Sequence, residues 1–178
     1  MMICPACGNK HFSPVQLEGG LPGERCKDCS GVWVELERYR IWRSKMPAVA
    51  ALEFPGDIGL SDGAVRVCAT TGRLMARINV SRDPVLRLDF SPMADAVWLD
   101  RGEWEALVAL GLHDQLDAIV SERWQRELKE AASRERMEAN LRARFGDADY
   151  EELLRMRAWL QGQPKRADMV AFLNAKAD

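Results

Sequence analysis

Two closely spaced cysteine pairs constrain this 178-residue chain more than any other feature of its sequence. The pairs are Cys4-Pro5-Ala6-Cys7 and Cys26-Lys27-Asp28-Cys29, and 18 residues lie between them. Two cysteines three residues apart on a tight turn direct both sulfurs toward one point, and 18 residues are enough for a β-hairpin that brings the second turn over the first. Zn²⁺ binds four thiolates in a tetrahedron at about 2.3 Å. We therefore predict one zinc ion per chain, held by Cys4, Cys7, Cys26 and Cys29.

Other roles for these cysteines fit the sequence less well. The chain has five cysteines, an odd number, and no secretory signal is visible, so a metal site in a cytoplasmic protein is favoured over disulfides. A thioredoxin-like redox site needs one C-x-x-C pair between a strand and a helix, and a second pair would be superfluous. Iron also occupies four-sulfur tetrahedra, but this spacing is typical of zinc ribbons. Four ligands leave no open position, which predicts a structural site rather than a catalytic one.

The same pattern recurs 65 residues further along the chain. Val32-Trp33-Val34-Glu35 aligns with Val97-Trp98-Leu99-Asp100. The four positions that would hold a metal in the second copy are occupied by Cys68, Thr71, Ser91 and Ala94. Because a single thiol does not hold zinc, we predict that the second ribbon is metal-free and stabilised by packing. Alternating apolar residues on either side of Ser81–Pro84 predict its hairpin.

The cysteine and tryptophan patterns resemble the transcription-factor-IIB-type zinc-ribbon domains of small bacterial proteins. Such domains carry Cys-Pro-x-Cys-Gly and, later, Trp-Leu-Asp-x-Gly-Glu-Leu. The first copy supplies the cysteines, and the second supplies Trp98-Leu99-Asp100-Arg101-Gly102-Glu103-Trp104. The resemblance implies a zinc-ribbon fold and no known catalytic activity.

The remaining sequence predicts helices, which makes the fold class α+β. We expect two zinc-ribbon-like β-hairpin modules, the second metal-free, followed by a helical C-terminal region. The expected divisions are residues 1–46 for the first ribbon and its helix, 47–63 for a linker, 64–112 for the second ribbon and its helix, and 113–178 for the helical region. Residues 113–145 contain no Gly or Pro and predict one long helix, or two with a joint near 129–136. We expect residues 120–128 to pack against the second ribbon, and we expect the first ribbon to be freer to project on the 47–63 linker.

Charge and composition exclude several classes of protein. The chain has 25 Lys and Arg residues and 27 Asp and Glu residues, and no segment has an excess of basic residues. We therefore expect nucleic-acid binding to be weak at best. No run of 18 apolar residues is present, so we expect no membrane span. No Ser-His-Asp set, phosphate-binding loop or paired carboxylates are apparent, so we predict no enzymatic activity.

These observations favour a zinc-binding, non-catalytic adaptor that binds another, unidentified protein through its helices or a ribbon surface. The alternative is a zinc-ribbon factor associated with nucleic acid or with the transcription machinery. Aromatic side chains are common anchors in protein interfaces. The candidates for partner contact are Trp104, Trp124 and Trp159.

Overall fold

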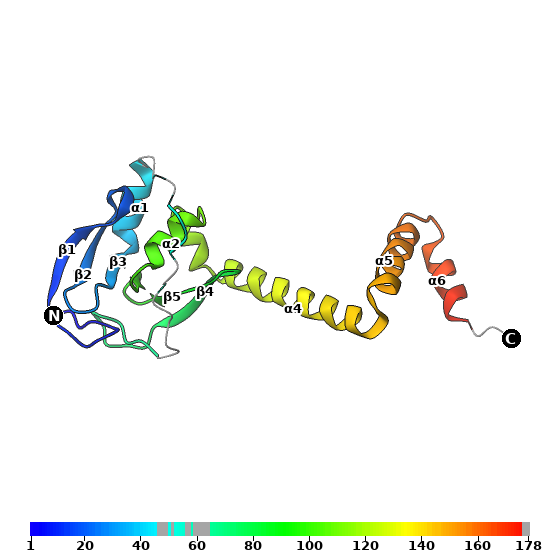
Figure 1. The fold of residues 1–178 in the computed structure, drawn as a ribbon, viewed down its shortest axis with the longest axis horizontal. Helices are drawn as coiled ribbons and strands as arrows, with labels where there is room; N and C mark the ends of the chain where they lie inside the picture. Colours follow the sequence, from blue (N-terminus) through cyan, green and yellow to red (C-terminus); the bar gives the residue numbers. More distant parts are fainter. Residues whose placement is uncertain (46–49, 51, 56–57, 59–64, 176–178) are drawn as a thin grey trace. The chain divides into compact units, whose positions relative to one another are not determined.

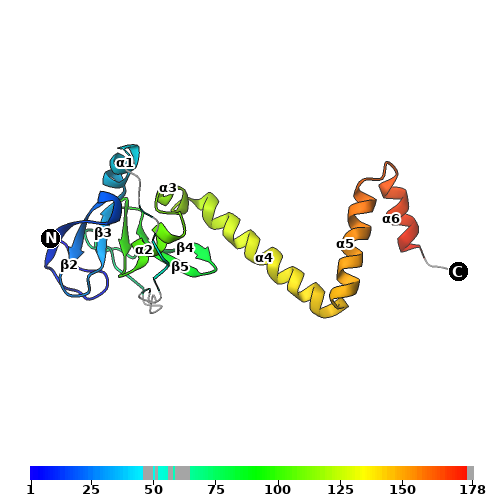
Figure 2. The same cartoon turned by 45° about the horizontal axis from the view of Figure 1, so that its top comes forward.

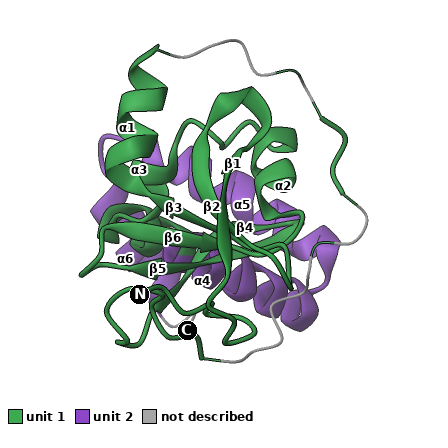
Figure 3. Cartoon of the chain, turned by 90° about the vertical axis from the view of Figure 1, so that its left-hand side faces the viewer, with its two compact units in different colours: residues 1–128 green, residues 129–178 purple. Residues whose placement is uncertain are grey.

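The computed structural model describes residues 1–45, 50, 52–55, 58 and 65–175. The chain divides into two compact units, residues 1–128 and residues 129–178 (Figure 3). The described residues form a six-stranded antiparallel sheet and six α-helices, which confirms the α+β class (Figure 1). Among the described residues, no helix combines the length and the apolar composition needed to cross a membrane.

The first unit holds the whole sheet, and the second unit is helical. In chain order the first unit contains β1 (Phe12–Gln16), the 3-10 helix η1 (Glu18–Gly20), β2 (Pro22–Cys26), β3 (Val32–Glu35), α1 (Leu36–Lys45), β4 (Ala76–Arg82), β5 (Val85–Ser91), β6 (Ala96–Leu99), α2 (Glu103–Ala109) and α3 (Leu116–Ile119). Helix α4 (Glu122–Phe145) begins in the first unit and continues into the second, which also contains α5 (Asp147–Gln161) and α6 (Arg166–Asn174).

The strand order is β1-β2-β3-β6-β5-β4, so the two three-stranded segments meet at β3 and β6. The register pairs Trp33 with Trp98, Val32 with Leu99, and Val34 with Val97. In the repeat, Val32 corresponds to Val97 and Val34 corresponds to Leu99, and each of these residues pairs with the counterpart of the other. A local twofold axis at the pair of Trp33 and Trp98 therefore relates β3 to β6. That residues 64–112 are a degenerate copy of the first ribbon stays a prediction.

Each face of the sheet carries its own apolar core. Val34 and Val97 point to one face, where they pack with residues of α1, α2 and α3, including Tyr39, Leu107 and Leu116. Figure 2 shows these three helices beside the strands. The alternate residues Trp33 and Trp98 point to the other face. There they pack with the two cysteine turns, a cluster that comprises Cys4, Cys26, Cys68, Ala69, Met75 and Ala96.

The two segments do not behave as separate modules. We expected the first ribbon to be freer to project on a linker, and this was wrong because β3 is hydrogen-bonded to β6 within one sheet. The two compact units also cut across the expected divisions at residues 46, 63 and 112. Most of the predicted linker, 47–63, lies outside the described residues.

The predicted packing of residues 120–128 against the second segment is confirmed. Strand β4 is an edge strand with an irregular register between Asn79 and Ser81. The side-chain amide of Gln125 donates to the carbonyl of Asn79 (2.7 Å) and accepts from its backbone N–H (3.0 Å). Unpaired backbone groups at a sheet edge invite pairing with other chains, and Gln125 satisfies two of them here.

The helical stretch after residue 113 is interrupted earlier than expected. Instead of a joint near residues 129–136, the chain breaks between α3 and α4 at Ser121. The Ser121 hydroxyl accepts from the backbone N–H of Trp124 (3.3 Å), as an N-cap residue does. Apolar periodicity continues through this short break, so the sequence pattern alone did not reveal it.

We predict that Gly31→Ala destabilises both segments of the sheet. A Cβ at residue 31 would lie 2.2 Å from Cζ2 of Trp98, a ring that is completely buried and has no room to move. We expect a loss of about 1–3 kcal/mol in the free energy of unfolding, because overpacking forces side chains off their rotamers. The measurement is denaturant unfolding of the zinc-loaded protein.

Gly162→Ala is the matched control, since a Cβ there meets only an ordinary contact at 3.6 Å and the residue has a helical φ of −81°. An unchanged unfolding midpoint for Gly31→Ala would contradict the predicted close packing of Trp98 on the cysteine turn.

Candidate metal centre

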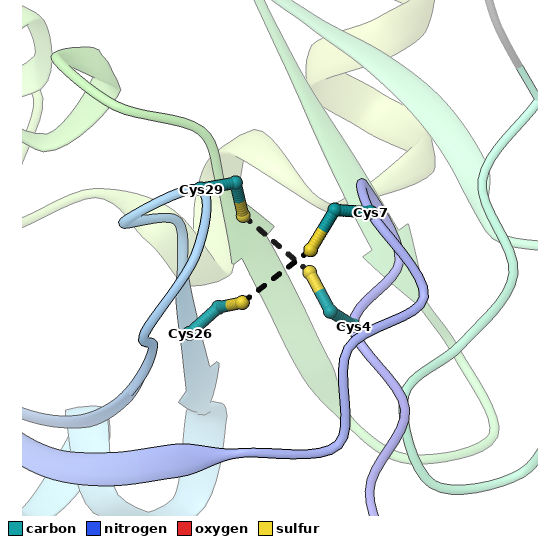
Figure 4. A group of neighbouring side chains, drawn as sticks. All are labelled: Cys4, Cys7, Cys26 and Cys29. Carbon is teal, nitrogen blue, oxygen red and sulfur yellow. Dashed lines mark hydrogen bonds between the residues drawn. The ribbon is translucent and has the colours of Figure 1, made fainter.

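The four predicted ligands come together at one point in the first segment. The Sγ atoms of Cys4 and Cys29 are 3.5 Å apart, as are those of Cys7 and Cys26, and all four sulfurs lie within 4.8 Å of one another (Figure 4). Tetrahedral coordination at about 2.3 Å places sulfurs about 3.8 Å apart. The observed spacing therefore fits one metal ion.

Local hydrogen bonds shape both cysteine turns in the same way. The N–H of Gly8 donates to the carbonyl of Cys4 (3.0 Å), and the N–H of Ser30 donates to the carbonyl of Cys26 (3.1 Å). Both residues that close these turns have positive φ, 76° at Gly8 and 63° at Ser30. Glycine adopts this conformation freely, whereas Ser30 does so at some cost. Gly31 is required for a different reason, which is the close approach of the Trp98 ring.

Burial and local hydrogen bonds change the pKa values of Cys4, Cys26 and Cys29 in different directions. Burial raises the pKa of Cys4 and raises that of Cys29 to about 11. Burial also acts to raise the pKa of Cys26, but backbone N–H groups of Cys29 and Asp28 and the neighbouring thiols outweigh it and lower the pKa to about 7. Thiolates this close together repel one another, so a bound cation must displace the remaining protons.

This donor set fits zinc and predicts its role. All four donors are soft thiolates from two C-x-x-C turns, and they complete a tetrahedral shell without a water or substrate position. Zinc bound by Cys4, Cys7, Cys26 and Cys29 would supply folding energy by joining two turns far apart in sequence. Cys4 and Cys26 are buried, Cys29 is partly buried and Cys7 is exposed, so the site lies at the surface of the unit.

Residues of the second segment contact both cysteine turns of the metal centre. The N–H of Ile3, next to the first ligand, donates to the carbonyl of Ala69 (2.9 Å). Trp98 packs edge-on against Phe12, with ring centroids 6.5 Å apart, and its ring lies over Gly31. The indole N–H of Trp98 donates to Asp100 (2.8 Å), which fixes the ring in place.

The corresponding turn of the second segment holds a single thiol. Cys68 is buried, and its Sγ accepts from the N–H of Thr71 (3.4 Å) and lies 3.5 Å from Oγ1 of Thr70. Burial acts to raise the pKa of Cys68, but hydrogen bonds to Ser91 and Thr70 outweigh it and lower the pKa to about 7. Within the described residues, the only group of at least three His, Cys, Asp or Glu side chains placed for a metal ion is the four-cysteine set.

The three tryptophans expected at a partner surface differ in exposure. Trp104 is 1% exposed, which corrects that expectation: its indole N–H donates to the carbonyl of Glu18 (3.1 Å), and its ring contacts Trp42 and His113. Trp124 is half-buried against the core of the first unit. Trp159, in the second unit, is 57% exposed.

Sequence reasoning missed the side chain that joins α1 to the second segment. Arg40 donates to Asp95 in the turn between β5 and β6 (2.5 Å) and to Asp117 of α3 (2.8 Å). The partners lie 55 and 77 residues away, so no local pattern connects them. The backbone of the same turn accepts from Leu36, whose N–H lies 2.8 Å from the carbonyl of Asp95.

Comparison with known proteins agrees with this geometry. Residues 3–45 match the family model described as "Transcription factor zinc-finger", the ribbon type of transcription factor IIB. These residues are therefore similar to zinc ribbons of that type. The match ends at Lys45, the last residue of α1, so the second segment and the later helices lie outside it. No curated protein and no solved structure matches the chain significantly.

We predict that Cys29→Ser abolishes stoichiometric zinc binding and that Cys68→Ser does not. Cys29 is one of four ligands, and structural zinc in finger peptides supplies roughly 10–16 kcal/mol of apparent binding free energy. Cys68 is a buried, hydrogen-bonded thiol outside the four-cysteine set, so its replacement costs about 1–2 kcal/mol of unfolding free energy. Metal analysis of the two purified variants makes the comparison. Loss of zinc from Cys68→Ser would show that the ligand assignment is wrong.

Proposed function

We propose that the protein is a zinc-stabilised, non-catalytic adaptor that binds another protein through its second unit. The observation that carries this proposal is the exposure of apolar side chains in residues 129–175. In that range the only buried side chain among the described residues is Tyr150. The exposed large apolar side chains there are Met137, Phe145, Leu153, Met156, Trp159, Val170, Phe172 and Leu173. Apolar surface of this extent marks an interaction site.

The first unit supplies a rigid body for this role. Its metal centre has no free coordination position, which supports a structural role and gives zinc no substrate to activate. Its aromatic residues Trp33, Trp98 and Trp104 are each 1% exposed or less, so they contribute to the core. We therefore assign partner contact to the helices of the second unit.

The alternative, a nucleic-acid or transcription-associated factor, draws support from the description of the matching family. The net charge of the first unit disfavours this alternative, because the unit has 15 Lys and Arg residues against 18 Asp and Glu residues. Phosphate binding needs an excess of basic residues, and single-strand binding uses exposed aromatic rings on which bases stack. The ribbon tryptophans are buried, so they offer no such platform. These observations favour the adaptor function.

We predict that the immobilised full-length protein retains a protein partner from nuclease-treated lysate at physiological salt. Trp159→Glu together with Phe172→Glu should weaken retention by at least about thirtyfold, since buried aromatic anchors each contribute about 2 kcal/mol or more. Quantitative mass spectrometry of the eluates makes the measurement.

Met93→Glu is the matched control, because Met93 is a 61% exposed apolar residue of the first unit. Equal retention by the protein and its Trp159/Phe172 variant would contradict the assigned surface. Retention that occurs only in lysate left without nuclease would favour the nucleic-acid alternative.

A further inference from the structure

The charges of α5 are divided between the two halves of the helix. Residues 147–154 carry only acidic charges: Asp147, Asp149, Glu151 and Glu152. Residues 155–166, which complete α5 and lead into α6, carry only basic charges: Arg155, Arg157, Lys165 and Arg166. Asp147 and Glu151 are paired with Arg142 of α4, and Lys165 and Arg166 lie beyond the end of α5. The charges that α5 presents to a covering surface are therefore those of Asp149 and Glu152 in its first half and those of Arg155 and Arg157 in its second half.

An exposed apolar stripe runs along the same helix. Leu153, Met156 and Trp159 recur every three residues, which places them on one side of α5, and they are 46%, 44% and 57% exposed. Helix α6 packs beside α5 and adds Phe172, which is 80% exposed. Between the two helices lies an apolar groove of about 410 Å³. Its apolar lining comprises Trp159, Leu160, Met169, Phe172 and Leu173.

We infer that this α5–α6 surface binds the same surface of a second copy of this chain, with the two α5 helices antiparallel. This inference rests on one part of the proposed function, that the exposed surface of the second unit binds protein, and it names a second copy as the occupant of that surface. A twofold axis across α5 places the acidic half of each helix against the basic half of the other. A parallel arrangement would place acidic half against acidic half and is disfavoured by repulsion.

The second unit leaves eight large apolar side chains exposed among its described residues. A helical unit of this length with one buried side chain does not bury enough apolar area to be stable alone, and oligomerisation is a common solution.

The test uses charge reversal in full-length, zinc-loaded protein, with the molar mass in solution measured by light scattering at physiological salt. The unmodified protein should be a dimer. One variant makes the two acidic residues of the apolar side basic, Asp149→Lys with Glu152→Lys, and the other makes the two basic residues of the second half of α5 acidic, Arg155→Glu with Arg157→Glu. Each variant alone should dimerise at least about tenfold more weakly, because both contacts of its homodimer join like charges.

Mixing the two variants in equal amounts should restore the dimer, since both contacts of the mixed pair then join opposite charges. All four substituted residues are exposed. The ion pair between Glu152 and Arg155 lies at the surface and contributes little to stability, so its loss should not unfold the helix. Arg123→Glu with Glu127→Lys, which reverses an exposed pair on α4 in the first unit, is the control and should leave the dimer intact.

A monomeric unmodified protein would overturn the inference, as would a dimer unaffected by both reversals or not restored by mixing. A monomer that still retains a partner through Trp159 would overturn the second-copy inference and leave the adaptor function standing. A dimer that responds to charge reversal as described, yet retains no other protein, would support the inference and contradict the adaptor function.

Discussion

Strand β3 lies against β6 over four residue pairs, and this contact joins two three-stranded segments into one sheet. Each of these strands would otherwise be an edge strand with unpaired backbone groups. At the centre of the contact, Trp33 opposes Trp98, and both rings are buried on the face that carries the cysteine turns. The cysteine turns therefore pack against a sheet whose hydrogen bonds join all six strands of the first unit.

This arrangement explains how the second segment keeps its fold with one thiol in place of four. Zinc holds the first pair of turns, and a metal-free hairpin of this length is marginal in water by itself. Here β5 and β6 extend the sheet that contains β2 and β3 of the first segment. Arg40 of α1 also forms hydrogen bonds to Asp95, in the turn between β5 and β6, and to Asp117 of α3. Gln125 closes the outer edge at β4. The second segment therefore draws its stability from neighbours on both sides.

The sequence was sufficient for the ligands and insufficient for the arrangement of the segments. Thiol spacing is a local property, so Cys4, Cys7, Cys26 and Cys29 were identified from the chain alone. Helix α1 and the end of α4 at Gly146 also follow local signals. The β3–β6 pairing joins residues about 65 positions apart, and the burial of Trp104 depends on Trp42, His113 and a carbonyl at Glu18. Such contacts arise from tertiary packing and leave no periodic pattern in the sequence.

The central claim is that the metal centre and the second segment form one cooperative unit. Hydrogen exchange measured by mass spectrometry before and after zinc removal by a chelator tests it most directly. The account predicts that residues 12–35 and residues 76–99 lose protection together, because β3 and β6 share the centre of one sheet. Full protection of residues 76–99 in the zinc-free protein would contradict it.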